Sequence, residues 1–422
     1  MFDTNEVEEK VILVAVDVDD GSDVESSLDE LEELSQTAGA VCVGRLIQSR
    51  DRIHVATYIG KGKVEELREL VHIWGADTVI CDDELSPAQL GNLQDELGCK
   101  VIDRTVLILD IFAAHAATNE GKLQVELAQL RYRASRLTGL GKSLSRIGGS
   151  AAGGGVGGIG TRGPGEKKLE MDRRLIHDRI SFINKQLKSV VSNRDTMRKQ
   201  REKGSIQTVA IVGYTNAGKS TLLNKLTDAS VLEEDMLFAT LDPTTRQYEY
   251  ENGKKILMTD TVGFINKLPH QLIRAFRSTL EEAKYADLIL HVVDASNPNY
   301  ETQMDVVYDT LDELEVRNKP IVTVFNKMDA EISEKPRKDT RSESSHYISA
   351  KQGFGLDEML DGIREILDQS YIEIEKVFDY SDAGKIQVIR KYGNLEIEEY
   401  REDGIFVKGT LPSEYESYCL GR

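Results

Sequence analysis

One segment of the chain has the glycine, lysine and serine spacing of a phosphate-binding loop. It reads Gly213-Tyr214-Thr215-Asn216-Ala217-Gly218-Lys219-Ser220 and continues into Thr221. Its glycines let backbone N–H groups converge on phosphate oxygens, Lys219 adds a positive charge at the β- and γ-phosphates, and the Ser220 hydroxyl can ligate Mg²⁺. Residues 207–212 are strand-like, and residues 221–226 have the pattern of a helix whose N-terminus would face the phosphates. The segment therefore predicts a nucleoside triphosphate site.

Three later segments indicate which base and which metal this site takes. Asp260-Thr261-Val262-Gly263 could hold Mg²⁺ through water with its carboxylate and reach the γ-phosphate with the Gly263 N–H. Asn326-Lys327-Met328-Asp329 ends in a carboxylate that can accept hydrogen bonds from guanine N1–H and N2–H₂. Adenine lacks these donors, and a site built to pair with them rejects it strongly. Ser349-Ala350-Lys351 would support the base through its main chain, so the chain is expected to bind GTP rather than ATP.

A threonine between these segments is the expected sensor of the γ-phosphate. The segment Phe238-Ala239-Thr240-Leu241-Asp242 lies between the phosphate loop and Asp260. We assign Thr240 as the second protein ligand of Mg²⁺ beside Ser220, with Thr244 and Thr245 as competitors. Such a threonine orders its loop in the GTP state and releases it after hydrolysis. Lys219, Thr240 and Gly263 are the expected catalytic residues, and no side chain is an obvious general base.

Two residues bear on how fast the site would hydrolyse GTP. Phe264 occupies the position after Gly263 at which many GTPases place a water-orienting Gln, and a phenyl ring cannot orient water by hydrogen bonding. Intrinsic hydrolysis is therefore expected to be slow, with a partner or a backbone group completing the site. Asn216 suggests a K⁺ ion near the phosphates, and the alternative is that it only stabilises the loop.

The segments that must position these residues divide the chain into four parts. Residues 1–118 alternate strand-like runs (11–16, 41–47, 53–59, 77–81, 100–102) with helical patterns (26–36, 63–74 and a helix capped by Ser86), which predicts an α/β domain with a mostly parallel sheet. Residues 206–370 form a second α/β unit, the P-loop GTPase domain. Residues 371–422 are expected to form a small α+β domain with a helix at 383–391 and strands at 395–400 and 404–409.

Residues 119–205 have a different period and a different charge. Apolar positions step by three and four residues on both sides of one connection, which predicts a long antiparallel helical hairpin. The connection, residues 139–165, contains twelve glycines and is expected to be a flexible loop. Residues 122–203 hold 19 Lys and Arg against 7 Asp and Glu, whereas the whole chain has a net charge of −19 and its remainder carries −31. This segregation of charge points to an RNA partner for the hairpin despite the acidic total.

The cysteine usage and the lack of targeting signals lead us to expect a cytoplasmic protein. The four cysteines, Cys42, Cys81, Cys99 and Cys419, are scattered without a Cys-x-x-Cys pair, so neither a disulfide framework nor a zinc site is indicated. The chain has no apolar run of about 18 residues, so no integral membrane association is expected. Its N-terminus, residues 1–6, lacks the pattern of a signal peptide.

The chain resembles the HflX family of P-loop GTPases over nearly its whole length. Besides the nucleotide motifs, the resemblance rests on four segments: Tyr58 to Lys63, Val101 to Thr105, Gly121 to Leu127 and Gly160 to Glu166. Lys167-Lys168 stands where the family has Thr-Gln, and the glycine loop is longer. The resemblance implies binding to the large (50S) ribosomal subunit through ribosomal RNA, with dissociation of stalled or idle ribosomes. A monomer without a DNA partner is expected.

Alternatives remain at two levels. The chain could be a ribosome-assembly GTPase that acts on pre-subunits, or a GTP-switched module that binds a protein and makes no RNA contact. Charge reversal of Arg173, Arg174 and Arg179 would separate the last of these from the others. Gly60-Lys61-Gly62-Lys63, at a strand-to-helix turn, could form a second anion site or a plain capped turn.

Overall fold

A computed structural model of the chain describes residues 8–19, 21, 23–147, 164–202, 206–227, 237–238, 243–251, 253–269, 272, 282–332, 335–369 and 371–421. The chain forms two compact units. The first comprises residues 1–188, 235–241 and 266–277, and the second comprises residues 189–234, 242–265 and 278–422. Among the described residues, no helix is both long enough and apolar enough to cross a membrane.

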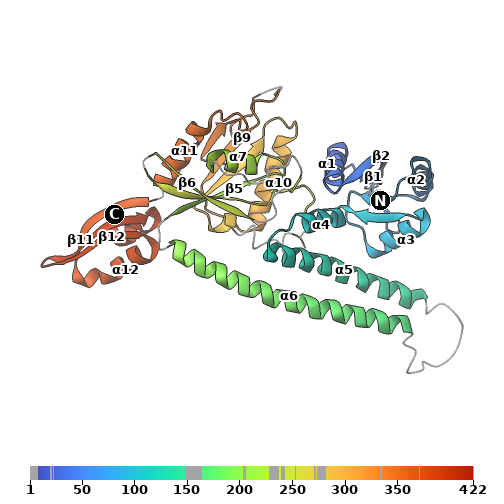
Figure 1. Ribbon diagram of the computed structural model, residues 1–422, viewed down its shortest axis with the longest axis horizontal. Helices are drawn as coiled ribbons and strands as arrows, with labels where there is room; N and C mark the ends of the chain where they lie inside the picture. The colour runs from blue at the N-terminus through green and yellow to red at the C-terminus, as the bar shows by residue number, and fades with distance from the viewer. Residues whose placement is uncertain are drawn as a thin grey trace, which may run out of the picture. The chain divides into compact units, whose positions relative to one another are not determined.

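The first unit contains a four-stranded parallel sheet (Figure 1). Its strands are β1 (Glu9–Asp17), β2 (Ala40–Ser49), β3 (Thr78–Cys81) and β4 (Lys100–Asp103), in the order β2-β1-β3-β4. Helix α1 (Val24–Thr37) packs with α4 (Arg104–His115), and α2 (Lys61–Trp74) packs with α3 (Pro87–Leu97). Residues 11–16 are buried throughout, as expected for a parallel strand covered on both faces. The predicted α/β domain is confirmed.

The strand predicted at residues 53–59 is wrong. This segment is a turn closed by an isolated bridge between His54 and Tyr58. Its carbonyl groups are satisfied by helix α3, since Gln89 Nε2 donates to His54 O and Asn92 Nδ2 donates to Ala56 O, each at 2.8 Å. The backbone needs no strand partner once these side chains pair with it, so the apolar pattern alone misassigned the segment.

The predicted helical pair consists of α5 (Asn119–Ile147) and α6 (Pro164–Glu202). Leu123 and Leu127 of α5 pack on Ile183 of α6, with Leu130, Ile180 and Leu187 beside them. Arg179 binds Glu126 through two hydrogen bonds of 2.7 and 2.8 Å. Residues 139–147, predicted as loop, continue α5 instead. A glycine costs about 1 kcal/mol inside a helix, and each added residue still contributes a hydrogen bond. The predicted loop residues 148–163 lie outside the described part of the chain.

The second unit contains a six-stranded sheet that carries the nucleotide motifs. Its strands are β5 (Gln207–Gly213), β6 (Thr244–Glu249), β7 (Lys255–Asp260), β8 (Leu288–Asp294), β9 (Ile321–Asn326) and β10 (Ser344–Tyr347), in the order β10-β9-β8-β5-β7-β6. Among the described strands of this sheet, only β6 runs antiparallel to its neighbour, β7. Helices α7 (Lys219–Thr227), α10 (Tyr300–Glu313) and α11 (Leu356–Gln369) accompany it. The parallel strands place the ends of β5, β7 and β9 at one edge, where each motif begins.

The C-terminal part is a three-stranded antiparallel sheet with helices, as predicted. Its strands are β11 (Tyr371–Phe378), β12 (Asn394–Arg401) and β13 (Gly404–Pro412), in the order β11-β13-β12. Helix α12 (Ala383–Tyr392) packs on it through Ile386 and Ile389, and α13 (Glu416–Leu420) follows. Strand β11 was not predicted, although Ile372 and Ile374 alternate with Glu373 and Glu375 in the pattern of a half-buried strand.

His291 of β8 makes the second unit sensitive to acid. Its ring is 1 % exposed, it packs edge-on against Tyr308, and its Nδ1 has no hydrogen-bond partner among the described residues. Burial lowers the pKa of His291 to about 4 from its ordinary 6.5, opposed by Asp339. The unfolded chain therefore binds more protons between these values. One pKa unit corresponds to about 1.4 kcal/mol, so unfolding free energy is expected to fall by at most about 3 kcal/mol as pH drops from 6.5 to 4.

Urea unfolding followed by circular dichroism across this pH range checks the expectation. The variant His291→Gln should lose most of the pH dependence, leaving the smaller contribution of His346, whose pKa is also lowered by burial. Trp74 is the only tryptophan of the chain and lies in α2, so its fluorescence reports on the first unit and serves as a control. An identical pH slope in both proteins would contradict the assignment to His291.

Candidate functional site

The phosphate-binding loop joins the end of β5 to the start of α7 and is shaped by two glycines. Gly213 lies against the backbone of β8, and a Cβ there would overlap Val292 O. Gly218 has φ +88° and lies against Asn326 Nδ2, which likewise leaves no room for a side chain. These close approaches explain why the loop needs glycine at both positions.

Lys219 is a buried cation at the centre of the loop. Its Nζ donates to Tyr214 O at 2.7 Å, which bends the side chain back over the loop. Burial lowers the pKa of Lys219 to about 8, and the Asp260 carboxylate opposes that shift. Phosphate oxygens at the loop would favour the charged form, because a nearby anion stabilises a buried ammonium.

Ser220, the Mg²⁺ ligand predicted in the phosphate loop, meets Asp260 at the end of β7, the carboxylate expected to hold Mg²⁺ through water. Ser220 Oγ donates to Asp260 Oδ2 at 2.7 Å, and Asp260 is fully buried. A hydroxyl and a carboxylate are oxygen ligands of the kind that Mg²⁺ prefers, so this pair fits that ion. Thr240, assigned as the other ligand, lies outside the described residues with its neighbours 239, 241 and 242. Of the two competing threonines, Thr245 forms a hydrogen bond of 2.9 Å between its Oγ1 and Thr259 Oγ1, and Thr244 lies opposite Asp260 in the β6–β7 register.

The segment that ends in Gly263 lies directly against the phosphate loop. Phe264 N donates to Gly213 O at 3.0 Å, and Thr215 N donates to Phe264 O at 2.8 Å. A Cβ at Gly263 would lie 3.0 Å from Lys219 Nζ, so the glycine allows its backbone to approach the phosphate site. The Phe264 ring is buried in the protein interior. This position therefore offers a backbone group to the site and no polar side chain.

The groups expected to recognise guanine converge although they come from distant segments. Asn326 Nδ2 donates to Ala217 O, and Asn326 Oδ1 accepts from Ala350 N, both at 2.9 Å. Asn326 thereby ties the phosphate loop to the Ser349–Lys351 segment. Ser349 Oγ donates to Asp329 Oδ1 at 2.6 Å, which lowers the pKa of that exposed carboxyl group. The Ser349 hydrogen bond thus favours the ionised carboxylate, the form that could accept hydrogen bonds from a base.

Sequence reasoning missed two contacts within the first unit, one made by Phe238 and one by Lys267. Phe238 meets Phe112 of α4 edge-on, with ring centroids 4.6 Å apart. Lys267 Nζ binds Asp82 Oδ2 at 2.5 Å and Asp83 Oδ1 at 2.8 Å, just beyond the end of β3. These partners are separated by more than a hundred residues, and no local pattern announces such pairs.

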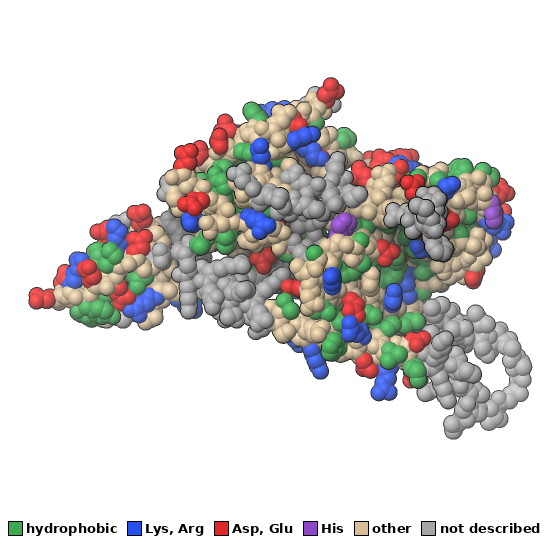
Figure 2. Space-filling model, viewed as in Figure 1, with side chains coloured by type: hydrophobic (Ala, Val, Ile, Leu, Met, Phe, Trp, Pro, Cys, Tyr) green, Lys and Arg blue, Asp and Glu red, His purple; other side chains and the backbone are tan. Residues whose placement is uncertain are grey.

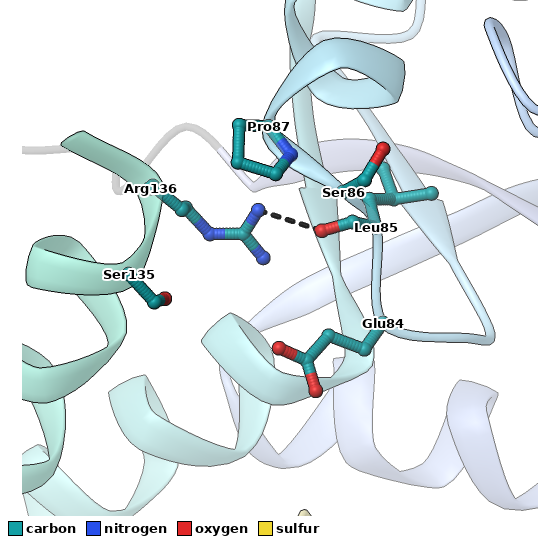
Figure 3. A pocket seen from close by; sticks show the side chains of 6 residues that line it. All are labelled: Glu84, Leu85, Ser86, Pro87, Ser135 and Arg136. Atoms are coloured by element: carbon teal, nitrogen blue, oxygen red, sulfur yellow. Dashed lines mark hydrogen bonds between the residues drawn. The ribbon is translucent and has the colours of Figure 1, made fainter. Parts of the chain in front are cut away.

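A polar cavity of about 370 Å³ lies in the first unit, between α5 and the start of α3 (Figure 3). Arg136 reaches across it to Leu85 O at 2.8 Å and to Asp103 Oδ2 at 2.6 Å. Glu84 shares the cavity, and burial raises the pKa of its carboxyl group. Since Asp103 already balances the guanidinium, the cavity has no net charge that favours a phosphate.

At the predicted second anion site, Gly60 is the N-cap of α2, and its N–H donates to Gln48 Oε1 at 2.7 Å. One N-terminal donor of the helix is therefore already satisfied. Gly60 supplies no side-chain cap hydrogen bond, and both the anion site and the capped turn remain predictions.

Some basic side chains of the helical pair are exposed, whereas one forms an ion pair that joins the two helices. Figure 2 shows Lys and Arg side chains projecting from the region of α5 and α6. Arg173 and Arg174 of α6 are exposed, as are Lys185 and Lys188. Arg179 instead binds Glu126 across the two helices. A charge reversal at Arg179 would therefore disturb the helical pair as well as any RNA contact.

Fold and site together define a P-loop GTPase. Three family models match the chain: "GTP-binding GTPase N-terminal" over residues 25–113, "GTP-binding GTPase Middle Region" over 115–201 and "50S ribosome-binding GTPase" over 208–327. The chain is 58% identical to GTPase HflX of Lacrimispora saccharolytica over 414 residues, which cover 98% of this chain and 96% of the relative. It is 42% identical to GTPase HflX of Escherichia coli over 370 residues, with coverage of 87% and 85%.

The chain belongs to the HflX family of GTPases, which confirms the resemblance and the GTPase activity inferred from the motifs. Among solved structures, the chain is similar to a crystal structure of an SsGBP and GDP complex. The identity is 24%, the TM-score is 0.47, and the match covers 85% of this chain and 99% of the other.

Proposed function

We propose that this GTPase binds the large (50S) ribosomal subunit in the cytoplasm, as a monomer, and dissociates stalled or idle ribosomes in its GTP state. One observation supports the proposal above all: the chain combines a predicted guanine-nucleotide site with a basic helical pair. Residues 122–203, which include this pair, have an excess of twelve positive charges. Such a surface binds an RNA backbone by releasing counterions. Ribosomal RNA is recognised largely through its shape and phosphates, which suits a long helical pair.

In the proposed mechanism, Lys219 and the backbone of residues 213–218 hold the phosphates of GTP. Ser220 and Thr240 would ligate Mg²⁺ directly and Asp260 through water. When bound, this ion neutralises charge on the β- and γ-phosphates. The Gly263 N–H would contact the γ-phosphate. The loop of Thr240 would be ordered while the γ-phosphate is bound and released after it is lost. Asn326, Asp329 and Ser349 to Lys351 hold the base, and Lys327 and Met328 complete that turn.

The attacking water is the part that this chain leaves incomplete. Phe264 points into the protein interior, and no side chain of the described site replaces a water-orienting Gln. Ribosomes are therefore expected to raise the GTPase rate by completing the site. A hydrolysis rate that is the same with and without ribosomes would contradict this part of the proposal.

The role of Asn216 is open between a K⁺ site and a structural role. Its backbone has φ +57°, a conformation that Asn adopts more readily than most residues, which favours the structural role. Equal GTPase rates in KCl and NaCl would exclude K⁺ as a fixed charge at the phosphates.

Sucrose-gradient sedimentation of intact ribosomes tests the main proposal. With a non-hydrolysable GTP analogue, we expect the 70S peak to shrink, free subunits to rise and the protein to migrate with 50S. The variant Lys219→Ala should do neither. Unchanged 70S peaks without co-migrating protein would reject the proposal. Binding to 50S precursors without splitting would instead favour a ribosome-assembly GTPase.

A charge-reversal pair separates RNA binding from a purely protein-binding role. Arg173→Glu with Arg174→Glu should weaken 50S binding sharply and reduce its salt dependence, because each lost phosphate contact lowers the salt slope by about one. The matched control is Arg68→Glu with Arg317→Glu, which changes the net charge equally at exposed sites in α2 and after α10. Equal effects of the two pairs would indicate nonspecific electrostatics.

A further inference from the structure

The turn that carries Asp329 is held in an uncommon backbone conformation. Lys327 has φ +62°, a left-handed conformation that a long side chain rarely adopts. Met328 N donates to Ile348 O at 3.1 Å and Ala330 N donates to Lys327 O at 3.0 Å, so the carbonyl of Lys327 and the N–H of the next residue are both hydrogen-bonded. Such a conformation persists only when its surroundings enforce it.

Asp294 at the end of β8 supplies part of that enforcement. Its Oδ2 binds Lys327 Nζ at 2.8 Å, while its Oδ1 accepts from Ser296 N at 3.0 Å and from Ser296 Oγ at 2.6 Å. The Asp294 side chain is 14% exposed and that of Lys327 is 32% exposed, so the ion pair is only partly screened by water. Ser296 thus fixes one carboxylate oxygen and leaves the other aimed at Lys327.

A second bond joins the same two strand ends. Ala295 N donates to Asn326 O at 3.0 Å, continuing the parallel pairing of β8 with β9 beyond Asp294 and Asn326. Asn326 in turn contacts Ala217 O and Ala350 N on the two sides of the nucleotide site. The end of β8 therefore supports both the asparagine and the lysine of this turn, through Ala295 N and the Asp294 carboxylate.

We propose that Asp294 is a positioning residue for guanine recognition: by holding Lys327, it fixes the turn that presents Asp329 to the base. The inference rests on the proposed role of Asp329. Asp294 would influence binding of the base and not of the phosphates, so the affinities for GDP and GTP should change alike. Hydrolysis at saturating GTP should be unaffected, because Asp294 touches neither the γ-phosphate nor Gly263.

Nucleotide binding by the full chain tests the proposal, with a fluorescent GDP and a fluorescent non-hydrolysable GTP as probes. Asp294→Ala is expected to raise both Kd values by about tenfold, the combined effect of a lost partly buried ion pair and a relaxed strained turn. KM for GTP should rise by the same factor with kcat unchanged. Asp294→Asn keeps one acceptor oxygen, which can serve Ser296 or Lys327 but not both in their present geometry, and should restore part of the affinity. The matched control is Asp305→Ala, which removes an exposed ion pair to Arg341 in the same unit.

The following results would overturn the inference or separate it from the proposed role of Asp329. Equal Kd values for Asp294→Ala and the wild type, or a lower kcat with unchanged Kd, would overturn the inference. Should Asp294→Ala fold poorly, Lys327→Met removes the same ion pair from its other end. A double-mutant cycle of Asp294→Asn with Lys327→Met must then be non-additive, and additivity would overturn the proposal. If Asp329→Asn leaves GTP binding intact, base recognition by Asp329 fails; if only the Asp294 variants are silent, this inference alone fails.

Discussion

Replacing Asp329 by Asn is expected to weaken GTP and GDP binding by about 10²–10³-fold, the loss of hydrogen bonds to an ionised acceptor. The carboxylate is exposed, ionised and oriented by Ser349 Oγ at 2.6 Å, so both of its oxygens can accept from guanine. An amide has a single acceptor, and its NH₂ group would face a guanine donor. Xanthine carries a carbonyl in place of the guanine amino group. The same variant should therefore gain affinity for xanthosine triphosphate.

Equilibrium binding of GTP, ATP and xanthosine triphosphate to the wild type and Asp329→Asn measures this exchange. Ser349→Ala is the matched control, because it removes the hydrogen bond that orients the carboxylate, together with the one that Ser349 Oγ accepts from Gln352 N at 3.1 Å. We expect it to weaken GTP binding by roughly five- to tenfold, the effect of one lost hydrogen bond, with no gain for xanthosine triphosphate. A uniform loss for all three nucleotides in Asp329→Asn would indicate a collapsed site and contradict the assignment.

The nucleotide motifs were predictable because each one follows a strand of a parallel sheet. The strand-like runs before Gly213, Asp260 and Asn326 are confirmed as β5, β7 and β9, whose ends meet at one edge. Local sequence thus contained both the chemistry and its approximate position. Thr240 remains a prediction, since it lies outside the described residues.

What sequence reasoning missed depends on which elements become neighbours. Asp294 meets Lys327 because β8 lies beside β9, a choice of strand order that no local pattern encodes. Residues 53–59 have a strand-like composition, yet helix α3 satisfies their backbone. Hydrophobic periodicity reports which face of a segment is buried, not which partner buries it. Contacts between distant polar groups are therefore found in the structure alone.

Removing Arg104 is the change expected to damage the first unit most. Its side chain is 2% exposed and binds Asp82, which is 1% exposed, through Nε at 3.1 Å and a terminal nitrogen at 2.6 Å. It also donates to Glu30 Oε1 at 2.7 Å and to Ser27 O at 2.8 Å. Breaking a buried pair from one side costs about 3–5 kcal/mol, because the remaining charge is left without compensation. Arg104→Ala should lose that much unfolding free energy.

The fluorescence of Trp74 follows this loss in a urea titration, since that residue lies in α2 of the same unit. Arg104→Lys keeps the charge but not the planar fork, so it should lose less than Arg104→Ala. Arg104→Met combined with Asp82→Leu removes both charges and should recover much of the stability, as a buried pair exchanged for apolar side chains often does. A double variant as unstable as Arg104→Ala would show that the loss arises from packing.

Lys267 decides how large the loss becomes. Its ammonium also binds Asp82, so in Arg104→Ala it remains as a partial counter-ion for the buried carboxylate. Burial raises the pKa of Asp82, but Arg104 and Lys267 lower it overall, so both cations stabilise the same ionised carboxylate. Loss of both should therefore exceed the sum of the single losses. Strict additivity of Arg104→Ala and Lys267→Ala would mean that Lys267 is a surface ion pair without such a role.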